Sequence, residues 1–440
     1  MATTDKRISV SELDFDGIKE NLKTFLKNQN EFTDYDFEGS GMNILLDVLA
    51  YNTHYSAMNV NLAANEMFID SASLRSSVVS HAKSLGYLPR SARSPVAVVD
   101  ITINDTSVTT ATIPRGTKFT TTIDNQNYNF FTISDLTQSR VSNVLTFTNV
   151  DLYEGDLITT RYTVDTTNID QKYIIPSTDV DTTTLKVTVQ NSSTDATTTV
   201  YTLNEDITQV TGTSNVYFLQ EVDNGQYEVY FGDGVLGRKL EDGEVVEMSY
   251  VRTNGKESNG ARTFSFAGVF LDDVGVLSVP YNVTGITTVS KASGGEDIES
   301  INKIKYLAPK YFASQNRAVT GSDYEVIARN VYPAISDIIV FGGEDQVPPA
   351  YGKVFIAIKP SDASFLSQFT KRQIEADLKQ YSVGSVRPVL VDPSILYVEL
   401  TSKIYYDGGK TNLLPRDVAS KVSSSITEYL KTSDTEKFNG

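Results

Sequence analysis

The chain has 440 residues, 40% hydrophobic and 21% charged, which is enough apolar material for about three domains and excludes disorder along the whole length. The absence of cysteine excludes disulfides, thiolate catalysis, iron–sulfur clusters and cysteine-bound zinc. Two histidines and a net charge of −17 disfavour a histidine-rich metal site and binding to a phosphate backbone.

The N-terminal region, residues 1–94, is predicted to be a helical module. It has no apolar stretch of signal-peptide length, so Sec export is not expected, and no part of the chain has the apolar run needed to span a membrane. Ser11 and Asp14 resemble a capping box before a first helix, in which apolar residues recur at helical spacing over 18–26. A third helix is predicted over 73–85.

Between them, a longer helix is predicted to begin near Asn43 and to carry an apolar stripe with heptad-like steps of 4-3-4-3-4. The stripe is too short to indicate a coiled coil by itself. One alternative is therefore that it packs solely against the two neighbouring helices of the same chain. Leu45 and Leu49 add a second apolar flank, and tyrosines are enriched at protein interfaces, so we favour contact with a partner. The candidate partner interface is Ile44, Val48, Tyr51, Tyr55, Met58 and Leu62.

The middle region, residues 95–290, is predicted to be rich in antiparallel β-structure. Residues 101–200 contain 27 threonines, a residue suited to the solvent face of strands. An insertion is possible around 151–225, and regular structure is indicated least clearly over 179–199, which could be a mobile insertion. The clearest predicted strands are 96–103, 227–231 and 245–251.

The C-terminal region, residues 291–440, is predicted to be an α+β domain with antiparallel pairing, so the whole chain belongs to the α+β multidomain class. Thr320 or Ser322 is expected to cap the second of its helices. The predicted helices are 298–308, 322–330, 369–381 and 415–430, and the predicted strands are 335–341, 353–358 and 396–406.

One motif could suggest a nucleotide site, because Gly232-Asp-Gly-Val-Leu-Gly237 matches G-x-G-x-x-G and follows a predicted strand. A dinucleotide site also needs a helix directly after the glycines, whereas residues 238–243 end in another glycine. We therefore predict a hairpin with its turn at Asp233-Gly234, positive φ at Gly237 and Gly243, and no bound nucleotide.

The remaining residues indicate no catalytic, cofactor or metal site, and the chain is predicted not to be an enzyme. His54 and His81 have serines nearby in sequence, but adjacent helical positions do not face each other. There is no tryptophan to stack on sugars, no calcium-loop pattern and no run of lysine or arginine for nucleic acid. Twenty-four tyrosines favour a protein that makes interaction surfaces.

Several segments resemble known baseplate families of contractile tails. Residues 227–237, followed by Gly243, Tyr250 and Asn259-Gly260, resemble the F-G-D-G-x-x-G block of baseplate J-like proteins. Segments 113–119, 293–300, 316–325 and 331–335 resemble other blocks of that family, and 36–52 and 65–70 are similar to the larger baseplate wedge subunit of T-even-like contractile-tailed phages.

This resemblance implies a structural subunit of a baseplate wedge, located in the virion tail and assembled in the host bacterial cytoplasm. It implies as partners the other wedge subunits and a second copy of the chain in each wedge, and no nucleic acid, membrane, cofactor, metal or small-molecule substrate. Such subunits form the ring around the tail hub and relay host contact to sheath contraction. The alternative from the residues alone is a secreted or surface β-rich adhesin or carbohydrate-active protein, which should carry an export signal and usually tryptophan.

Overall fold

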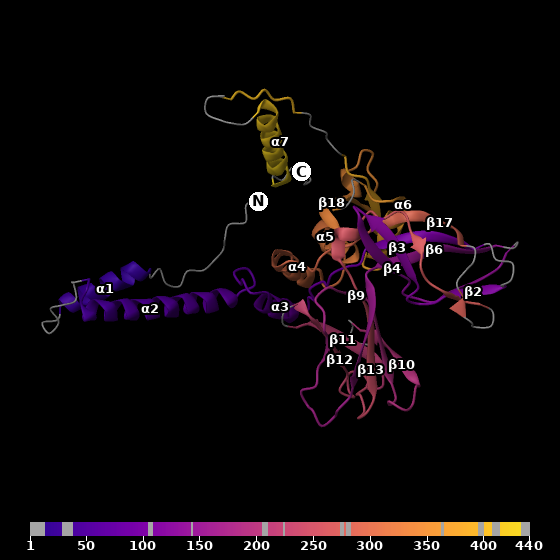
Figure 1. Cartoon of the computed structure of the whole chain (residues 1–440), viewed down its shortest axis with the longest axis horizontal. Coiled ribbons are helices and arrows are strands. Elements are labelled where there is room, and N and C mark those ends of the chain that lie inside the picture. Colours follow the sequence, from indigo (N-terminus) through magenta and orange to yellow (C-terminus); the bar gives the residue numbers. More distant parts are fainter. Residues whose placement is uncertain are drawn as a thin grey trace. The chain divides into compact units, whose positions relative to one another are not determined.

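The computed structural model of the chain has an N-terminal helical segment, a β-rich middle and a C-terminal α+β region, as the sequence predicts (Figure 1). By contacts between Cα atoms the chain divides into two compact units, which we describe separately. The first comprises 1–89, 220–226 and 299–312, and the second comprises the rest. The residues described are 14–28, 38–103, 109–141, 144–204, 210–222, 225–272, 277–278, 283–361, 365–394, 400–406 and 414–432.

The first unit is mainly helical. The first helix begins directly after Asp14, whose side chain makes no capping hydrogen bond, and Ser11 lies outside the described residues. The long helix begins earlier than predicted because the Ser40 side chain accepts a hydrogen bond from the Asn43 backbone N–H. The helices are α1 (Phe15–Lys27), α2 (Gly41–Glu66), α3 (Arg75–Ser84) and α4 (Ile301–Ser314).

A buried polar cluster joins three segments of this unit that are distant in sequence. Arg75 at the start of α3 donates to both carboxylate oxygens of Glu221, at 2.6 Å and 3.0 Å, and also to the Glu299 carbonyl. The hydroxyl of Tyr87 donates to the Glu299 carboxylate at 2.8 Å. Burial raises the pKa of Glu221, and its hydrogen bond and charge interaction with Arg75 oppose that rise. Because unpaired buried charges are costly, these contacts hold the three segments together.

In the second unit, one six-stranded sheet has the order β14-β3-β4-β6-β1-β17. Strand β1 has the predicted bounds and pairs antiparallel with both β6 and β17. Its inward side chains pack with Phe119, Phe130 and Phe147 in one core, beside a smaller sheet of order β16-β15-β2-β5. The strands are β1 (Val96–Ile103), β2 (Thr110–Ile113), β3 (Lys118–Ile123), β4 (Gln126–Phe131), β5 (Leu136–Ser139), β6 (Leu145–Glu154), β14 (Ser265–Phe266), β15 (Phe270–Leu271), β16 (Leu277–Ser278) and β17 (Val283–Ser293).

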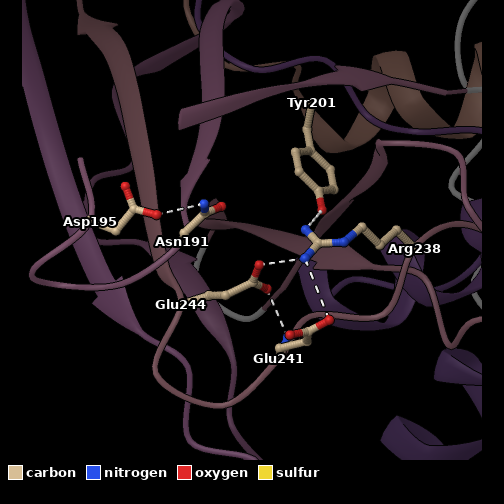
Figure 2. Close-up of polar contacts among 6 residues, drawn as sticks. All are labelled: Asn191, Asp195, Tyr201, Arg238, Glu241 and Glu244. Carbon is tan, nitrogen blue, oxygen red and sulfur yellow. Dashed lines mark hydrogen bonds and ion pairs between the residues drawn. The ribbon is translucent and has the colours of Figure 1, made fainter. Parts of the chain in front are cut away.

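A seven-stranded sheet has the order β7-β13-β9-β10-β11-β12-β8 and packs its own core around Tyr227 and Tyr250. The indication of little regular structure over 179–199 is wrong: this stretch contains β9, which pairs with β13 and β10, and the start of β10. Its polar residues occupy the turn between them, where the Asn191 amide donates to Asp195 (Figure 2). The strands are β7 (Asp156–Thr163), β8 (Tyr173–Ile175), β9 (Val180–Gln190), β10 (Thr198–Leu203), β11 (Val216–Glu221), β12 (Tyr227–Phe231) and β13 (Val245–Arg252).

The glycine motif at 232–237 forms a turn without a following helix, but the predicted hairpin is wrong. Strands β12 and β13, on its two sides, are not neighbours in the sheet, because β12 pairs with β8 and β13 with β7 and β9. In this turn the Asp233 carboxylate accepts hydrogen bonds from the backbone N–H groups of Val235 and Leu236. Gly237 and Gly243 have the predicted positive φ, at +89° and +82°. A Cβ on Gly232 would lie 2.2 Å from the backbone of Gly237, so close backbone contact requires this glycine.

In the C-terminal region, β18 and β19 are antiparallel, β19 and β20 are parallel, and α5 and α6 pack with this sheet around Tyr324 and Ile374. Thr320 caps α5 in a capping box with Asp323, as predicted. The predicted strand 396–406 is wrong over 400–406, which is irregular and exposed, and 396–399 lie outside the described residues. The elements are α5 (Gly321–Val331), β18 (Ile335–Gly342), β19 (Lys353–Pro360), α6 (Gln368–Lys379), β20 (Arg387–Val391), α7 (Pro415–Thr432) and the 3₁₀ turns Gly255–Ser258 and Gly343–Asp345.

Residues 238–244, after the glycine turn, form a polar clamp in place of a helix (Figure 2). The Arg238 guanidinium donates to Glu244 at 2.5 Å and to the Tyr201 hydroxyl at 2.7 Å. Glu244 also accepts from the backbone N–H of Glu241 at 2.7 Å, and its side chain is only 4% exposed. The hydrogen bond with Glu244 raises the pKa of Arg238. The clamp therefore fixes the start of β13 relative to β10.

We expect Arg238→Ala to lower the free energy of unfolding by about 3 kcal/mol, because it leaves the Glu244 carboxylate buried without its cation. The matched control is Arg161→Ala. It breaks the ion pair between Arg161 and Glu247, which are 2.7 Å apart, and the Arg161 side chain is 68% exposed. That loss should be below about 1 kcal/mol. Urea unfolding of the full chain followed by circular dichroism measures both, and equal losses would contradict the role of the clamp.

Candidate partner interface

All six residues of the predicted stripe lie on α2, and all six side chains are exposed. Their exposed fractions range from 42% for Leu62 to 60% for Val48. Successive residues of a helix turn by about 100°, so the six lie within about 40° of a single line along α2. The described chain therefore leaves this line of apolar side chains uncovered.

The face of α2 that is buried is a different one. Asn43, Leu46 and Ala50 are the residues of α2 that are at most 3% exposed. Helix α1 lies beside the N-terminal half of α2 (Figure 1), and an ion pair of 2.5 Å joins Lys19 of α1 to Asp47. Sequence reasoning missed this buried face because its pattern includes an asparagine and a small alanine, and the larger side chains of the stripe gave the stronger signal.

A second uncovered apolar face lies between the stripe and the buried face. Leu45, Leu49 and Val60 are 52–58% exposed. At about 100° per residue, this group, the stripe and the face under α1 are spaced about 120° apart around the helix axis. A helix that is apolar on all sides is typical of the centre of a bundle, and α1 covers only one of the three faces.

The charge and hydrogen bonding of α2 are also typical of the central helix of a bundle. Asp47 and Glu66 are its only charged residues among 26, although 21% of the chain is charged. Several of its polar side chains bond to the helix's own backbone, since Thr53 donates to the Leu49 carbonyl and Ser56 to the Asn52 carbonyl. Such side chains can enter a protein interface without losing their hydrogen bonds.

The two tyrosines of the stripe pack together, with ring centroids 4.6 Å apart. A hydrogen bond with Tyr55 raises the pKa of Tyr51, so the Tyr51 phenol is neutral at pH 7. A packed pair of tyrosine rings offers a partner a large contact area with polar edges.

Neither histidine belongs to a catalytic arrangement in the described residues. The Nε2 atom of His81 lies 2.9 Å from the Glu66 carbonyl, which ties α3 to the end of α2, and His54 packs its ring edge-on against Tyr55. No group of three or more acidic or histidine side chains in the described ranges could hold a metal ion. No helix among those described is long and apolar enough to cross a membrane.

Four family models match the chain in consecutive order, and all describe parts of one kind of protein. The helical domain of gp6-like baseplate wedge protein matches 14–87, domain II of baseplate wedge protein gp6 matches 97–155, its third domain matches 158–259, and C-terminal domain I of baseplate structural protein gp6 matches 320–391. Over these four stretches the chain is therefore similar to gp6-like baseplate wedge proteins.

One relative is baseplate wedge protein gp6 of Enterobacteria phage T4, which is 30% identical over 452 residues. The match covers 97% of this chain and 65% of the relative, so the chain spans less than two thirds of that protein's length. A match to a solved baseplate structure of the anti-feeding prophage covers 88% of this chain and 80% of the matched chain, at 11% sequence identity. Its TM-score of 0.29 is too low to indicate the same fold.

The buried and uncovered faces of α2 should respond differently to truncation in the isolated chain. Leu46→Ala should lower the free energy of unfolding of the helical unit by about 2–4 kcal/mol, because Leu46 is 3% exposed. Val48→Ala, two residues along, should change it by less than about 0.5 kcal/mol. Thermal unfolding of both variants compares them, and a large loss for Val48→Ala would place the stripe in the chain's own core.

Proposed function

We propose that this chain is a structural subunit of the wedge in the baseplate of a contractile phage tail, located in the virion. The four gp6 domain matches and the 30% identity to the T4 protein support this role, and the adhesin or carbohydrate-active alternative is not favoured. Within this role the chain works through protein contacts and not as an enzyme. Its domains are proposed to be 1–94, 95–290 and 291–440.

We infer that α2 joins the chain to its wedge neighbours, and the observation that carries this inference is the pair of uncovered apolar faces on α2. Two faces about 120° apart accept two further helices, one along the stripe and one along Leu45, Leu49 and Val60. The proposed sources of these helices are another wedge subunit and a second copy of this chain. The wedges then close a ring around the tail hub and relay host contact to sheath contraction.

We also propose that the chain is related to baseplate J-like proteins through their shared glycine block. This block, 227–237, lies inside the stretch that matches the third domain of gp6. The block's glycines have a structural role, because Gly232 and Gly237 approach closely and Gly234 has a φ of +93°. Conformational demands of this kind are a reason for two families to share the motif.

The first test of this proposal is location. Tails purified from the source phage should contain this chain, and antibody labelling viewed by electron microscopy should mark the baseplate end of the tail. A chain that is absent from tails, or that labels only the fibres or the cell surface, would contradict the wedge role.

The second test is aimed at the stripe. The double variant Val48→Asp with Tyr55→Asp should weaken association with the other wedge subunits at least about 100-fold, because it buries two unpaired carboxylates in the bundle. Size-exclusion chromatography of co-expressed wedge subunits measures the loss. The β-rich middle should keep its unfolding temperature, because both substitutions lie on exposed positions of α2.

A matched control carries the same chemical changes elsewhere. Val141→Asp with Tyr405→Asp replaces a valine and a tyrosine that are 73% and 89% exposed outside α2. This control should associate normally. If both double variants lose association equally, added charge and not the stripe is responsible.

A further inference from the structure

A cleft of about 290 Å³ lies within the larger compact unit, and no residue of α2 lines it. Residues 93–94, just before β1, form one part of its lining, and strand β6 and helix α6 contribute others. Neither the wedge role nor the glycine motif uses this cleft.

Two carboxylates that line the cleft have no partner. Asp151 of β6 is exposed and Asp377 of α6 is half-buried, and no described residue donates a hydrogen bond or a positive charge to either carboxylate. Burial raises the pKa of both carboxyl groups. A third acid, Asp181, is different, because it accepts hydrogen bonds from the backbone N–H groups of Ser94 and Thr183 at 2.9 Å and 3.0 Å.

Two further polar groups of the lining also lack hydrogen-bond partners among the described residues. Arg93 is the one arginine or lysine among the lining residues, and its Nε has no hydrogen-bond acceptor in the described chain. Its Nε is buried, and burial lowers the pKa of Arg93 while the charge of Asp181 opposes that change. The hydroxyl of Ser94, a residue only 3% exposed, is likewise buried without a partner. Buried polar groups are normally satisfied, so these atoms are free to bond with a group that enters the cleft.

Aromatic side chains complete the lining. Tyr153, Tyr332 and Phe369 contribute to it from β6, the end of α5 and α6. Burial, followed by the charge of Asp151, raises the pKa of Tyr153 to about 12, so its ring is a neutral phenol at pH 7. Neutral aromatic rings next to carboxylates favour an organic cation, which the ring faces attract directly.

We propose that this cleft receives a lysine-bearing segment of a neighbouring baseplate subunit, whose ammonium group lies between Asp151 and Asp377 while a backbone carbonyl of the same segment accepts from Arg93. An ammonium group has three donors that can reach carboxylates on different elements, whereas the planar guanidinium fork suits a single carboxylate. A metal ion fits less well, because the described residues offer no cluster of ligands. The proposal rests on the baseplate role, because it takes the partner from a neighbouring subunit.

The test is zero-length carbodiimide coupling of purified baseplates, which joins a carboxylate to an amine only when they are in direct contact. Mass spectrometry of the digested particles should find Asp151 or Asp377 linked to a lysine of another chain. The purified chain alone, treated in the same way, should give no such link. Asp151→Asn and Asp377→Asn should each remove their own link, and their near-identical shape should preserve folding, checked by thermal unfolding.

The control is Glu241→Gln, which removes a carboxylate whose side chain is 80% exposed in the same unit, and it should leave the links unchanged. Links from the two aspartates only to lysines of their own chain would overturn the proposal. So would intact baseplates that contain the chain but give no link at either aspartate, and in that case the wedge role would stand. A chain absent from the particles would overturn both the cleft proposal and the wedge role.

Discussion

Buried carboxylates at the ends of strands hold together segments that are far apart in the sequence, and the rest of the fold depends on them. Glu154 ends β6, is fully buried, and accepts from the Thr253 hydroxyl at 2.7 Å and from the backbone and side chain of Asn254. Glu221 ends β11 and is paired with Arg75 in the same way. Removing an ion from water is costly, so each such carboxylate is tolerated only where its donors lie at the right place. These contacts therefore select one arrangement of strands that threonine-rich sequences would otherwise specify weakly.

Local patterns predicted the elements well, because the pattern and the element share the same few residues. The strands 96–103 and 227–231 have the predicted bounds, and Thr320 caps its helix as expected. Pairing was not predictable in this way. The turn at 232–237 has the residues typical of a hairpin, yet β12 pairs with β8. Strand pairing depends on side chains from strands that are distant in the sequence. The strand pattern over 400–406 likewise has no neighbouring strand in the described chain.

The candidate interface on α2 was likewise only partly predictable from the sequence. Spacing alone identified Ile44 to Leu62 as one apolar line, but it could not indicate which face of α2 the chain covers itself. The covered face is set by α1, through Leu46 and the ion pair of Asp47 with Lys19, and these are tertiary contacts. The unpartnered groups of the cleft around Arg93 were also beyond sequence reasoning, since their residues come from segments up to 284 positions apart (93 to 377).

The charge distribution connects the two proposed contacts. A chain with a net charge of −17 is repelled by other copies of itself over most of its surface, so association is favoured only where that repulsion is removed or compensated. On α2 it is removed, because the exposed faces are apolar and nearly free of charge, and contact there depends on buried area and little on salt. At the cleft the proposed partner ammonium group compensates the repulsion, and such a contact weakens as salt rises. An assembly that used both proposed contacts would keep its helical core while the charged contact is released, so the first contact would be permanent and the second reversible.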